Sequence, residues 1–383
     1  MGDNNFEYRL LSNNVFPFNA PSAFSGGPEN PVPWNFRLSP SGQLNIGNFF
    51  VHLRVEGGAG QVAASRAGNT YFESTPSGTL SRDTILPNYV ERFDPSDKTD
   101  TLRANLALRS LMMGYNFDRD WSLRFGRHRY EVGPLETAFM TNSLAQATHY
   151  SNLYLPYGYL GAEVRYDRNR ENNFDQVIRR AMLSFSMIQG AENLPTSGYL
   201  GILQGQITFA QSFNDSEQRT ALNDPRFSLM GYVGFRGNQL PATHPENILD
   251  PGTAFGWGLG AVYEQGWWTL GLELVSQESS WIRSNHLEAS QERFQESLFM
   301  LLRPDKFRIR AAYSWLKRAD VLGNNPYDPP AGQSEQHWEI NAGYEVFPGI
   351  LPLLFYMGAN GSNDSMHVGG IGLLTSLGGM ISL

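Results

Sequence analysis

Residues 298–315, LFMLLRPDKFRIRAAYSW, carry the pattern that decides the fold class. A two-faced alternation of side chains runs through Leu298–Leu302 and again through Phe307–Trp315, with Pro304-Asp305 between them. Alternation with a period of two is typical of a β-strand with one apolar face, and Pro-Asp between two such runs is a turn signal. The stretch therefore predicts two antiparallel strands joined by a short turn.

The same alternation recurs along most of the chain, whereas helical periodicity is hard to find. Soluble sandwich strands average about 5–6 residues, whereas more than half of the segments here have nine or more residues. A tilted membrane-spanning strand needs about 9–11 residues. Strand length thus favours a barrel in a membrane. Fourteen strands are predicted, the other twelve being in Phe49–Val55, Leu102–Leu108, Trp121–Phe125, Gly158–Tyr166, Ala181–Met187, Tyr199–Phe209, Phe227–Phe235, Phe255–Tyr263, Trp268–Leu274, Trp338–Val346, Ile350–Ala359 and Met366–Leu383.

Composition excludes several classes of protein. Charged residues make up 17% of the 383 residues, below the roughly 25% of ordinary soluble domains. No run approaches the roughly 18 consecutive apolar residues of a membrane-spanning helix, which excludes helical membrane proteins. The chain has no cysteine, which excludes disulfides and thiolate metal sites, and its net charge of −8 without a basic block speaks against nucleic acid. No signal peptide is visible, and Met1-Gly2-Asp3 is interpreted as an initiator added to a processed chain.

Short and long connections alternate between the predicted strands along the chain. Even-to-odd junctions of the fourteen strands hold the short turns Asp118-Arg119, Gln265-Gly266, Pro304-Asp305 and Pro348-Gly349. Odd-to-even junctions hold the long loops 58–101, 131–155, 238–253, 279–293 and 318–336. Outer-membrane barrels have this asymmetry. The sequence therefore predicts an all-β fold, an antiparallel transmembrane β-barrel of about fourteen strands with short periplasmic turns and long external loops.

Aromatic residues gather beside the short turns. Tyrosine and tryptophan favour the membrane–water interface, because the ring is apolar and its polar edge stays hydrated. The aromatic residues beside the short turns therefore predict an aromatic girdle at that end of the strands. They are Phe117, Trp121, Tyr263, Trp267, Trp268, Phe307 and Phe347.

In its strand lengths, its alternation of short turns and long loops and its predicted aromatic girdle, the chain resembles bacterial outer-membrane porins and porin-like transporters, over about residues 44–383. The resemblance is one of architecture. It implies a location in the bacterial outer membrane, contact with lipid and lipopolysaccharide, a monomer or homotrimer, and no cofactor. One departure concerns the last residue, which is usually aromatic in such barrels, whereas this chain ends Met380-Ile381-Ser382-Leu383.

Residues 1–43 are rich in Asn, Pro, Ser and Gly and are predicted to lie outside the barrel wall. Two interpretations stay open, a periplasmic tail and a plug inside the lumen. Fourteen strands with an N-terminal plug resemble the long-chain fatty-acid transporters of the outer membrane. The strand count is also open, since 61–73 and 82–93 within loop 58–101 form either an external hairpin or two further strands, for sixteen.

The face opposite the apolar one is predicted to line the lumen, because side chains alternate across a sheet. Arginine exceeds carboxylate on that face. One interpretation is a mild preference for anions, since the guanidinium fork suits carboxylate and phosphate groups. The other is that the arginines pair with neighbouring carboxylates, so that they line a hydrated wall without giving a preference for anions. The predicted pore-lining residues are Arg54, Arg103, Arg109, Arg124, Arg165, Arg180, Arg236, Arg303, Arg308, Arg310, Glu56, Glu163, Asp167, Glu264, Glu273, Glu339 and Glu345.

Loop 131–155 is the candidate constriction of the channel. In general porins an early loop folds inward and narrows the lumen, and this loop has suitable length and composition. Its candidate residues are Glu131, Glu136, His149 and Tyr154.

The leading functional interpretation is an outer-membrane channel for passive or facilitated diffusion of small hydrophilic solutes. The alternatives are a plugged transporter of hydrophobic or amphipathic molecules and a barrel that sheathes a partner protein in its lumen. None of the seven histidines has a recognisable catalytic spacing, and there is no His-Glu-x-x-His motif. We therefore expect no catalytic residue, metal site or enzyme activity.

Overall fold

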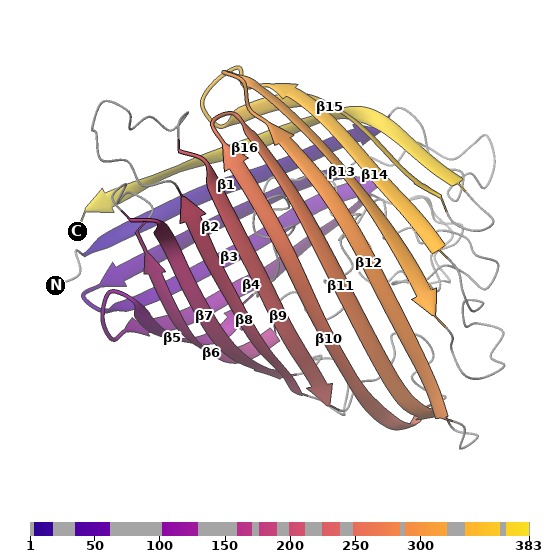
Figure 1. Ribbon diagram of the computed structural model, residues 1–383. Helices are drawn as coiled ribbons and strands as arrows, with labels where there is room; N and C mark the ends of the chain where they lie inside the picture. The colour runs from indigo at the N-terminus through magenta and orange to yellow at the C-terminus, as the bar shows by residue number, and fades with distance from the viewer. Residues whose placement is uncertain are drawn as a thin grey trace.

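The alternating segments form one antiparallel sheet that closes on itself as a sixteen-strand barrel (Figure 1). This computed structural model describes residues 4–17, 35–61, 102–128, 159–170, 176–189, 199–210, 224–237, 248–283, 288–319, 334–360 and 365–382. The strands are β1 (Asn5–Pro17), β2 (Asn35–Ile46), β3 (Phe49–Gln61), β4 (Leu102–Asn116), β5 (Trp121–His128), β6 (Tyr159–Asn169), β7 (Ile178–Gln189), β8 (Tyr199–Ala210), β9 (Arg226–Gly237), β10 (Ile248–Gln265), β11 (Trp268–Arg283), β12 (Glu288–Leu302), β13 (Phe307–Ala319), β14 (Ser334–Tyr344), β15 (Ile350–Asn360) and β16 (Ser365–Ser382).

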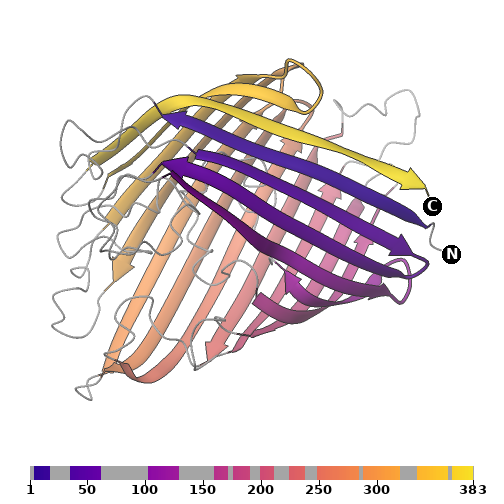
Figure 2. The same ribbon diagram turned by 180° about the vertical axis from the view of Figure 1, so that it is seen from behind.

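Each strand pairs with its neighbours in sequence, and the barrel closes between its first and last strands. β1 pairs with β16 from Asn5↔Ser382 to Pro17↔Gly370, so no edge strand is left unpaired. Figure 2 shows this seam, with both termini at the same end of the barrel. We call that end, which also carries the short turns, the turn end.

The two faces of the wall differ as the alternation predicts. On β11, the side chains of Leu270 and Leu272 are 40% and 45% exposed on the outside of the barrel. The flanking residues, Thr269 before Leu270 and Glu273 after Leu272, are only 3% and 0% exposed on the inside. An apolar outer wall of this extent requires lipid around it, so the all-β, transmembrane-barrel prediction is confirmed.

Within the described ranges, no helix is long and apolar enough to cross a membrane.

The short turns are built from residues that tolerate a left-handed backbone. Gly266, between β10 and β11, has a φ of +55°, and Gly349, between β14 and β15, has a φ of +78°. Asp305, between β12 and β13, is a non-glycine residue with a φ of +50°. Tight hairpins need positive φ at central positions, because only these match the right-handed twist of the flanking strands. The turns predicted at Gln265-Gly266, Pro304-Asp305 and Pro348-Gly349 are thus confirmed.

Aromatic rings touch on the outer wall at the turn end, both between neighbouring strands and between a strand and the turn that follows it. The ring centroids of Trp121 and Tyr166 are 5.2 Å apart. Those of Phe307 and Tyr344 are 5.0 Å apart, and Tyr115 meets Phe117 at 5.3 Å. The predicted girdle is therefore a set of interlocked rings, which marks where the barrel meets one membrane–water interface.

The prediction that residues 1–43 lie outside the wall is wrong for 5–17 and 35–43. Asn5–Pro17 and Asn35–Ile46 are β1 and β2, and they supply the strands that bring the count from fourteen to sixteen. Over the described side chains, β1 contributes polar groups to the inner face: the Arg9 guanidinium donates to Ser376 Oγ across the seam at 3.2 Å. Without β1 and β2 the sheet would have two edge strands with unpaired backbone groups. Closing the barrel satisfies these groups, which explains why this Asn- and Pro-rich segment forms strands that pair with β16 and β3.

Some expected loops are shorter than predicted. Most of 279–293 is strand, because β11 continues to Arg283 and β12 begins at Glu288. β10 likewise begins at Ile248, inside the expected loop 238–253. The strands extend beyond their apolar stretch, where the sequence pattern that defined them has ended. The expected hairpin in 61–93 lies outside the described residues, apart from Gln61 at the end of β3.

Three inward aromatic rings lie flat against glycines on the adjacent strand. Phe299 is opposite Gly271 in the register, and a Cβ on Gly271 would be 1.9 Å from the Phe299 ring. Phe50 over Gly114 and Tyr232 over Gly258 repeat the arrangement. An aromatic ring that covers a cross-strand glycine packs onto the bare backbone, which helps to fix the register.

Substitution Gly271→Ala should therefore destabilise the barrel by about 1–3 kcal/mol, the usual cost of overpacking. Gly205→Ala is the matched control, because its added Cβ would approach no atom closer than 3.6 Å. We expect this control to be neutral or slightly stabilising, since alanine has less conformational freedom to lose. The measurement is the free energy of unfolding in guanidinium. Equal effects of both substitutions would contradict the ring-on-glycine packing.

Candidate functional site

The inner wall carries most of the predicted lumen residues for which side chains are described. Glu163 on β6 is 3% exposed and lies between outward residues, Val164 being 44% exposed. The same inward position holds for the residues Arg54, Arg124, Arg165, Asp167, Arg180, Glu264, Glu273, Arg303, Arg308, Arg310, Glu339 and Glu345. The side chains of Arg103, Arg109, Arg236 and Glu56 lie outside the described part, as does loop 131–155 with Glu131, Glu136, His149 and Tyr154.

Ion pairs cover much of this inner wall. The nitrogen–oxygen distance is 3.7 Å in the pair Arg124–Glu163 on β5 and β6. At the turn end it is 2.5 Å in Arg308–Glu345 and 3.2 Å in Arg303–Glu264. In these pairs each arginine faces one carboxylate. Of the two interpretations that the sequence left open, these pairs favour the one in which arginines are paired with carboxylates and line a polar wall.

A second part of the wall, on β11 to β14, is polar and almost fully buried. Ser297 and Ser314 share a hydrogen bond of 2.8 Å, and Gln295 donates to Ser297 Oγ at 2.7 Å. Next to them, Asn341 donates to Glu339 Oε1, and the Arg310 guanidinium lies 3.9 Å from the same carboxylate. Glu273 and Glu339 are 0% exposed. These groups therefore form a buried polar network within the wall.

Among the described residues, arginines outnumber carboxylates at the turn end of β6 to β9. Asp167 accepts hydrogen bonds from Arg165 at 2.7 Å and from both Nε and Nη2 of Arg180 at 2.9 and 2.8 Å. Asp224, just before β9, accepts from Arg226 Nε at 3.0 Å and from Arg179 Nη2 at 3.4 Å. We call the group Arg165, Asp167, Arg179, Arg180, Asp224 and Arg226 the arginine cluster.

Counted over the described residues, the arginine cluster holds four guanidinium groups against two carboxylates, an excess of two positive charges. The side chains of Arg165, Arg180 and Arg226 are 19–26% exposed, so they reach solvent. Arg179 is 0% exposed and Asp224 is 3% exposed. The cluster thus has a buried ion pair in the wall and three arginines at its surface.

Sequence reasoning missed half of the arginine cluster. Strand alternation does not assign Arg179 to the inner face, because Arg179 is the extra residue of a β-bulge. The register passes from Ile178↔Phe209 to Arg180↔Thr208. Asp224 and Arg226 precede the apolar alternation of β9, so the alternation alone does not place them on a strand. A usable signal was present, since the spacing Asp224-x-Arg226 repeats Arg165-x-Asp167. Residues two apart point to the same face of a strand.

Metal ligands are not gathered anywhere in the part of the chain that the structure describes, since no group of three or more histidine or carboxylate side chains could hold an ion there. The inner wall is instead a surface of ion pairs, amides and hydroxyls. Such a surface can hydrate or bind polar solutes.

No family model matches the chain, and no curated protein sequence matches it. Solved structures do match. OmpF of Salmonella typhi, in a complex with daunomycin, aligns with a TM-score of 0.53 at 11% identity over 97% of each chain. The trimer form of OmpT, an outer membrane protein of Vibrio cholerae, aligns with a TM-score of 0.51 at 12% identity over 97% of this chain and 98% of that one. The architectural resemblance is thus confirmed at the level of the fold, which is that of outer-membrane porins.

Proposed function

We propose that the protein is an outer-membrane channel for passive diffusion of small hydrophilic solutes, with its turn end facing the periplasm. The observation that carries the proposal is a closed sixteen-strand barrel with an apolar outer wall and a charged, hydrogen-bonding inner wall. Barrels of 16–18 strands are wide enough to leave an aqueous channel, whereas about eight strands are filled by their own side chains. Transport rather than catalysis is the use that this wall supports.

The arginine cluster supports a mild preference for anions. The single pairs Arg303–Glu264 and Arg308–Glu345 are locally neutral, whereas the cluster has two positive charges in excess. Charge along a low-dielectric channel wall concentrates counter-ions near it. Anions are therefore enriched at the periplasmic mouth beside β6 to β9.

The plugged-transporter alternative has less support than it had from sequence. It required residues 1–43 to fill the lumen, whereas 5–17 and 35–46 belong to the wall. A diffusion channel remains the simpler function for this barrel.

Conductance across a planar lipid bilayer tests the channel. Purified barrel should give stepwise ohmic conductance and admit small neutral sugars in a liposome-swelling assay. A barrel that is folded, as shown by heat-dependent mobility on an SDS gel, and that conducts nothing would refute the proposal.

Substitution Arg165→Glu should shift the reversal potential in a potassium chloride gradient toward cation selectivity. It changes the cluster from an excess of two positive charges to neutral, while Asp167 keeps Arg180 as its partner. The shift should shrink in concentrated salt, because the screening length is about 10 Å at 0.1 M and about 3 Å at 1 M.

Lys306→Glu is the matched control for this substitution. It makes the same change of charge at the turn end, but in the turn between β12 and β13, on the opposite side of the barrel from β6. Lys306 is exposed there. A reversal potential that stays at the wild-type value in Arg165→Glu, or that moves equally in both variants, would show that the arginine cluster does not set selectivity.

A further inference from the structure

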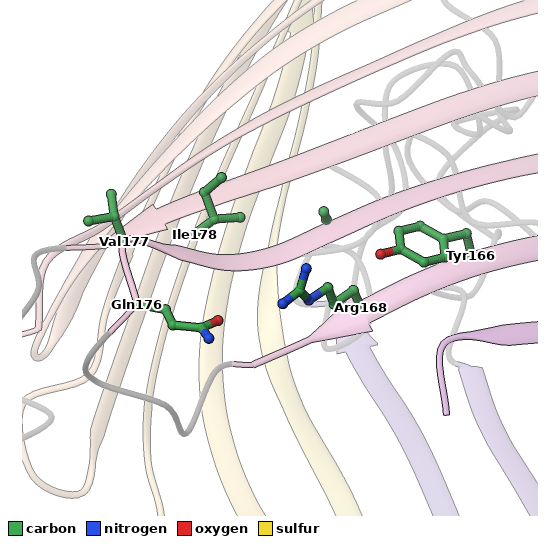
Figure 3. A pocket seen from close by; sticks show the side chains of 6 residues that line it. Tyr166, Arg168, Gln176, Val177 and Ile178 are labelled. Atoms are coloured by element: carbon green, nitrogen blue, oxygen red, sulfur yellow. The ribbon is translucent and has the colours of Figure 1, made fainter. Parts of the chain in front are cut away.

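An open groove of about 430 Å³ lies on the outer wall at the turn end, between β6 and β7 (Figure 3). It is lined by the residues Tyr166, Arg168, Gln176, Val177, Ile178 and Ala181. Tyr166 belongs to the outer aromatic girdle through its contact with Trp121, which places the groove at the membrane–water interface. The lumen charges lie on the other face of the same strands.

The groove exists because of local features of β7. Ala181 is the register partner of Arg168, and its short side chain leaves space beside the arginine. The bulge at Arg179 turns that residue into the wall, where it meets Asp224, while Val177 and Ile178 remain on the outside at 54% and 47% exposed. The start of β7 thus presents apolar side chains next to a cation.

Arg168 is a cation that no described side chain neutralises in this groove. Among the described residues, no side chain forms a hydrogen bond or ion pair with its guanidinium, and the side chain is exposed. Arg165, three residues earlier, is by contrast bonded to Asp167. Figure 3 shows Arg168 and Gln176 extending toward each other across the gap, with Val177 and Ile178 beside them.

We propose that this groove binds one anionic glycerophospholipid of the periplasmic leaflet, with its phosphate on Arg168 and one acyl chain along Val177, Ile178 and Ala181. A guanidinium matches phosphate oxygens with two parallel hydrogen bonds. Gln176 adds an amide donor for the glycerol or phosphate oxygens. The inference rests on the proposed membrane location. Lipid headgroups lie at the level of the groove if the barrel is embedded in the membrane with its turn end at the periplasmic interface.

The pairing of cation and apolar surface selects a lipid over a free phosphate compound. Free glycerol phosphate would use Arg168 and Gln176 but leave Val177 and Ile178 unpaired with any apolar group. A phospholipid uses both parts, and burying its chain adds affinity in proportion to the apolar area covered.

Native mass spectrometry of the detergent-purified full chain, mixed with palmitoyl-oleoyl phosphatidylglycerol, tests the site. Wild type should retain one tightly bound lipid. Arg168→Gln should weaken this binding about ten- to a hundredfold, as expected for the loss of a charge-assisted hydrogen bond. Ala181→Leu keeps the charge but fills the groove, and it should weaken binding as well.

Arg170→Gln is the matched control, because Arg170 lies at the same rim but faces Asp120, 3.9 Å away, and does not line the groove. It should retain the lipid as wild type does. Unchanged retention in both Arg168→Gln and Ala181→Leu would overturn the proposal. Displacement of the lipid by excess sn-glycerol 3-phosphate would also overturn it, by showing that the headgroup alone is recognised.

Conductance of the same preparations separates this inference from the proposed function. Barrels that conduct normally but bind the lipid equally well in every variant refute only the lipid site. Barrels that show the expected loss of lipid in Arg168→Gln yet conduct no ions refute the channel and leave the lipid site standing.

Discussion

Substitution Leu272→Arg should prevent efficient assembly of the barrel in a bilayer. Leu272 lies outward on β11, between the girdle residue Trp268 and the polar Ser276, and is 45% exposed to what would be lipid. An arginine on the lipid face costs about 2–4 kcal/mol near the bilayer midplane. That is a large part of a total stability of about 5–15 kcal/mol, so folding yield should fall sharply.

Two controls isolate the effect of the lipid-facing charge. Leu272→Met keeps the site apolar and nearly the same in volume, so the barrel should assemble as in wild type. Gln204→Arg places the same guanidinium on the inner face of β8, where water and polar groups surround it. The measurement is the fraction of heat-modifiable barrel after refolding into phosphatidylcholine liposomes. Normal assembly of Leu272→Arg with failure of Gln204→Arg would mean that the inner and outer faces are reversed.

The faces of most strands could be predicted because the alternation that defines them is local. On β11 and β13 each strand carries its own period of two, and a slip by one residue would turn every leucine into the lumen. The short turns were equally visible, since Gly266 and Gly349 supply the positive φ that their hairpins need. Local signals of this kind need no knowledge of the rest of the barrel.

The first two strands were missed because their stability depends on the far end of the chain. Phe6, Tyr8 and Leu10 do alternate with polar residues, but Asn13-Asn14 and Pro17 follow and interrupt the pattern. What holds β1 is its pairing with β16, more than 350 residues away in sequence, where Arg9 bonds to Ser376. Closure is a property of the whole sheet, so no window of sequence contains it.

The lumen charges show the same limit at the level of side chains. Parity assigned Arg165 and Asp167 to the inner face, but it could not say which carboxylate each arginine would meet. A bulge at Arg179 brings that residue to Asp224, across two strand pairings in the sheet. Alternation by parity does not account for an inserted residue, so the buried Arg179 and its contact with Asp224 could not be predicted from sequence.

Substitution Asp224→Asn should destabilise the folded barrel by about 3–5 kcal/mol, the usual cost of removing one partner of a buried ion pair. Asparagine has nearly the shape of aspartate, so packing is preserved and the loss is electrostatic. It removes the carboxylate from Arg179, whose side chain is 0% exposed and cannot turn to water. The surface partner Arg226 is partly hydrated and should contribute less to the loss.

The double variant Arg179→Met/Asp224→Asn should recover much of this loss, because replacing both members of a buried pair leaves no isolated charge. Glu264→Gln is the matched control: its pair with Arg303 is 42–44% exposed, and such pairs contribute only about 0–1 kcal/mol. Guanidinium unfolding in lipid gives each free energy. If Asp224→Asn cost no more than Glu264→Gln, the Arg179 charge would already be balanced by other groups. The bulge would then be explained by backbone geometry, and Asp224 would act mainly on the hydrated arginines at the mouth of the channel.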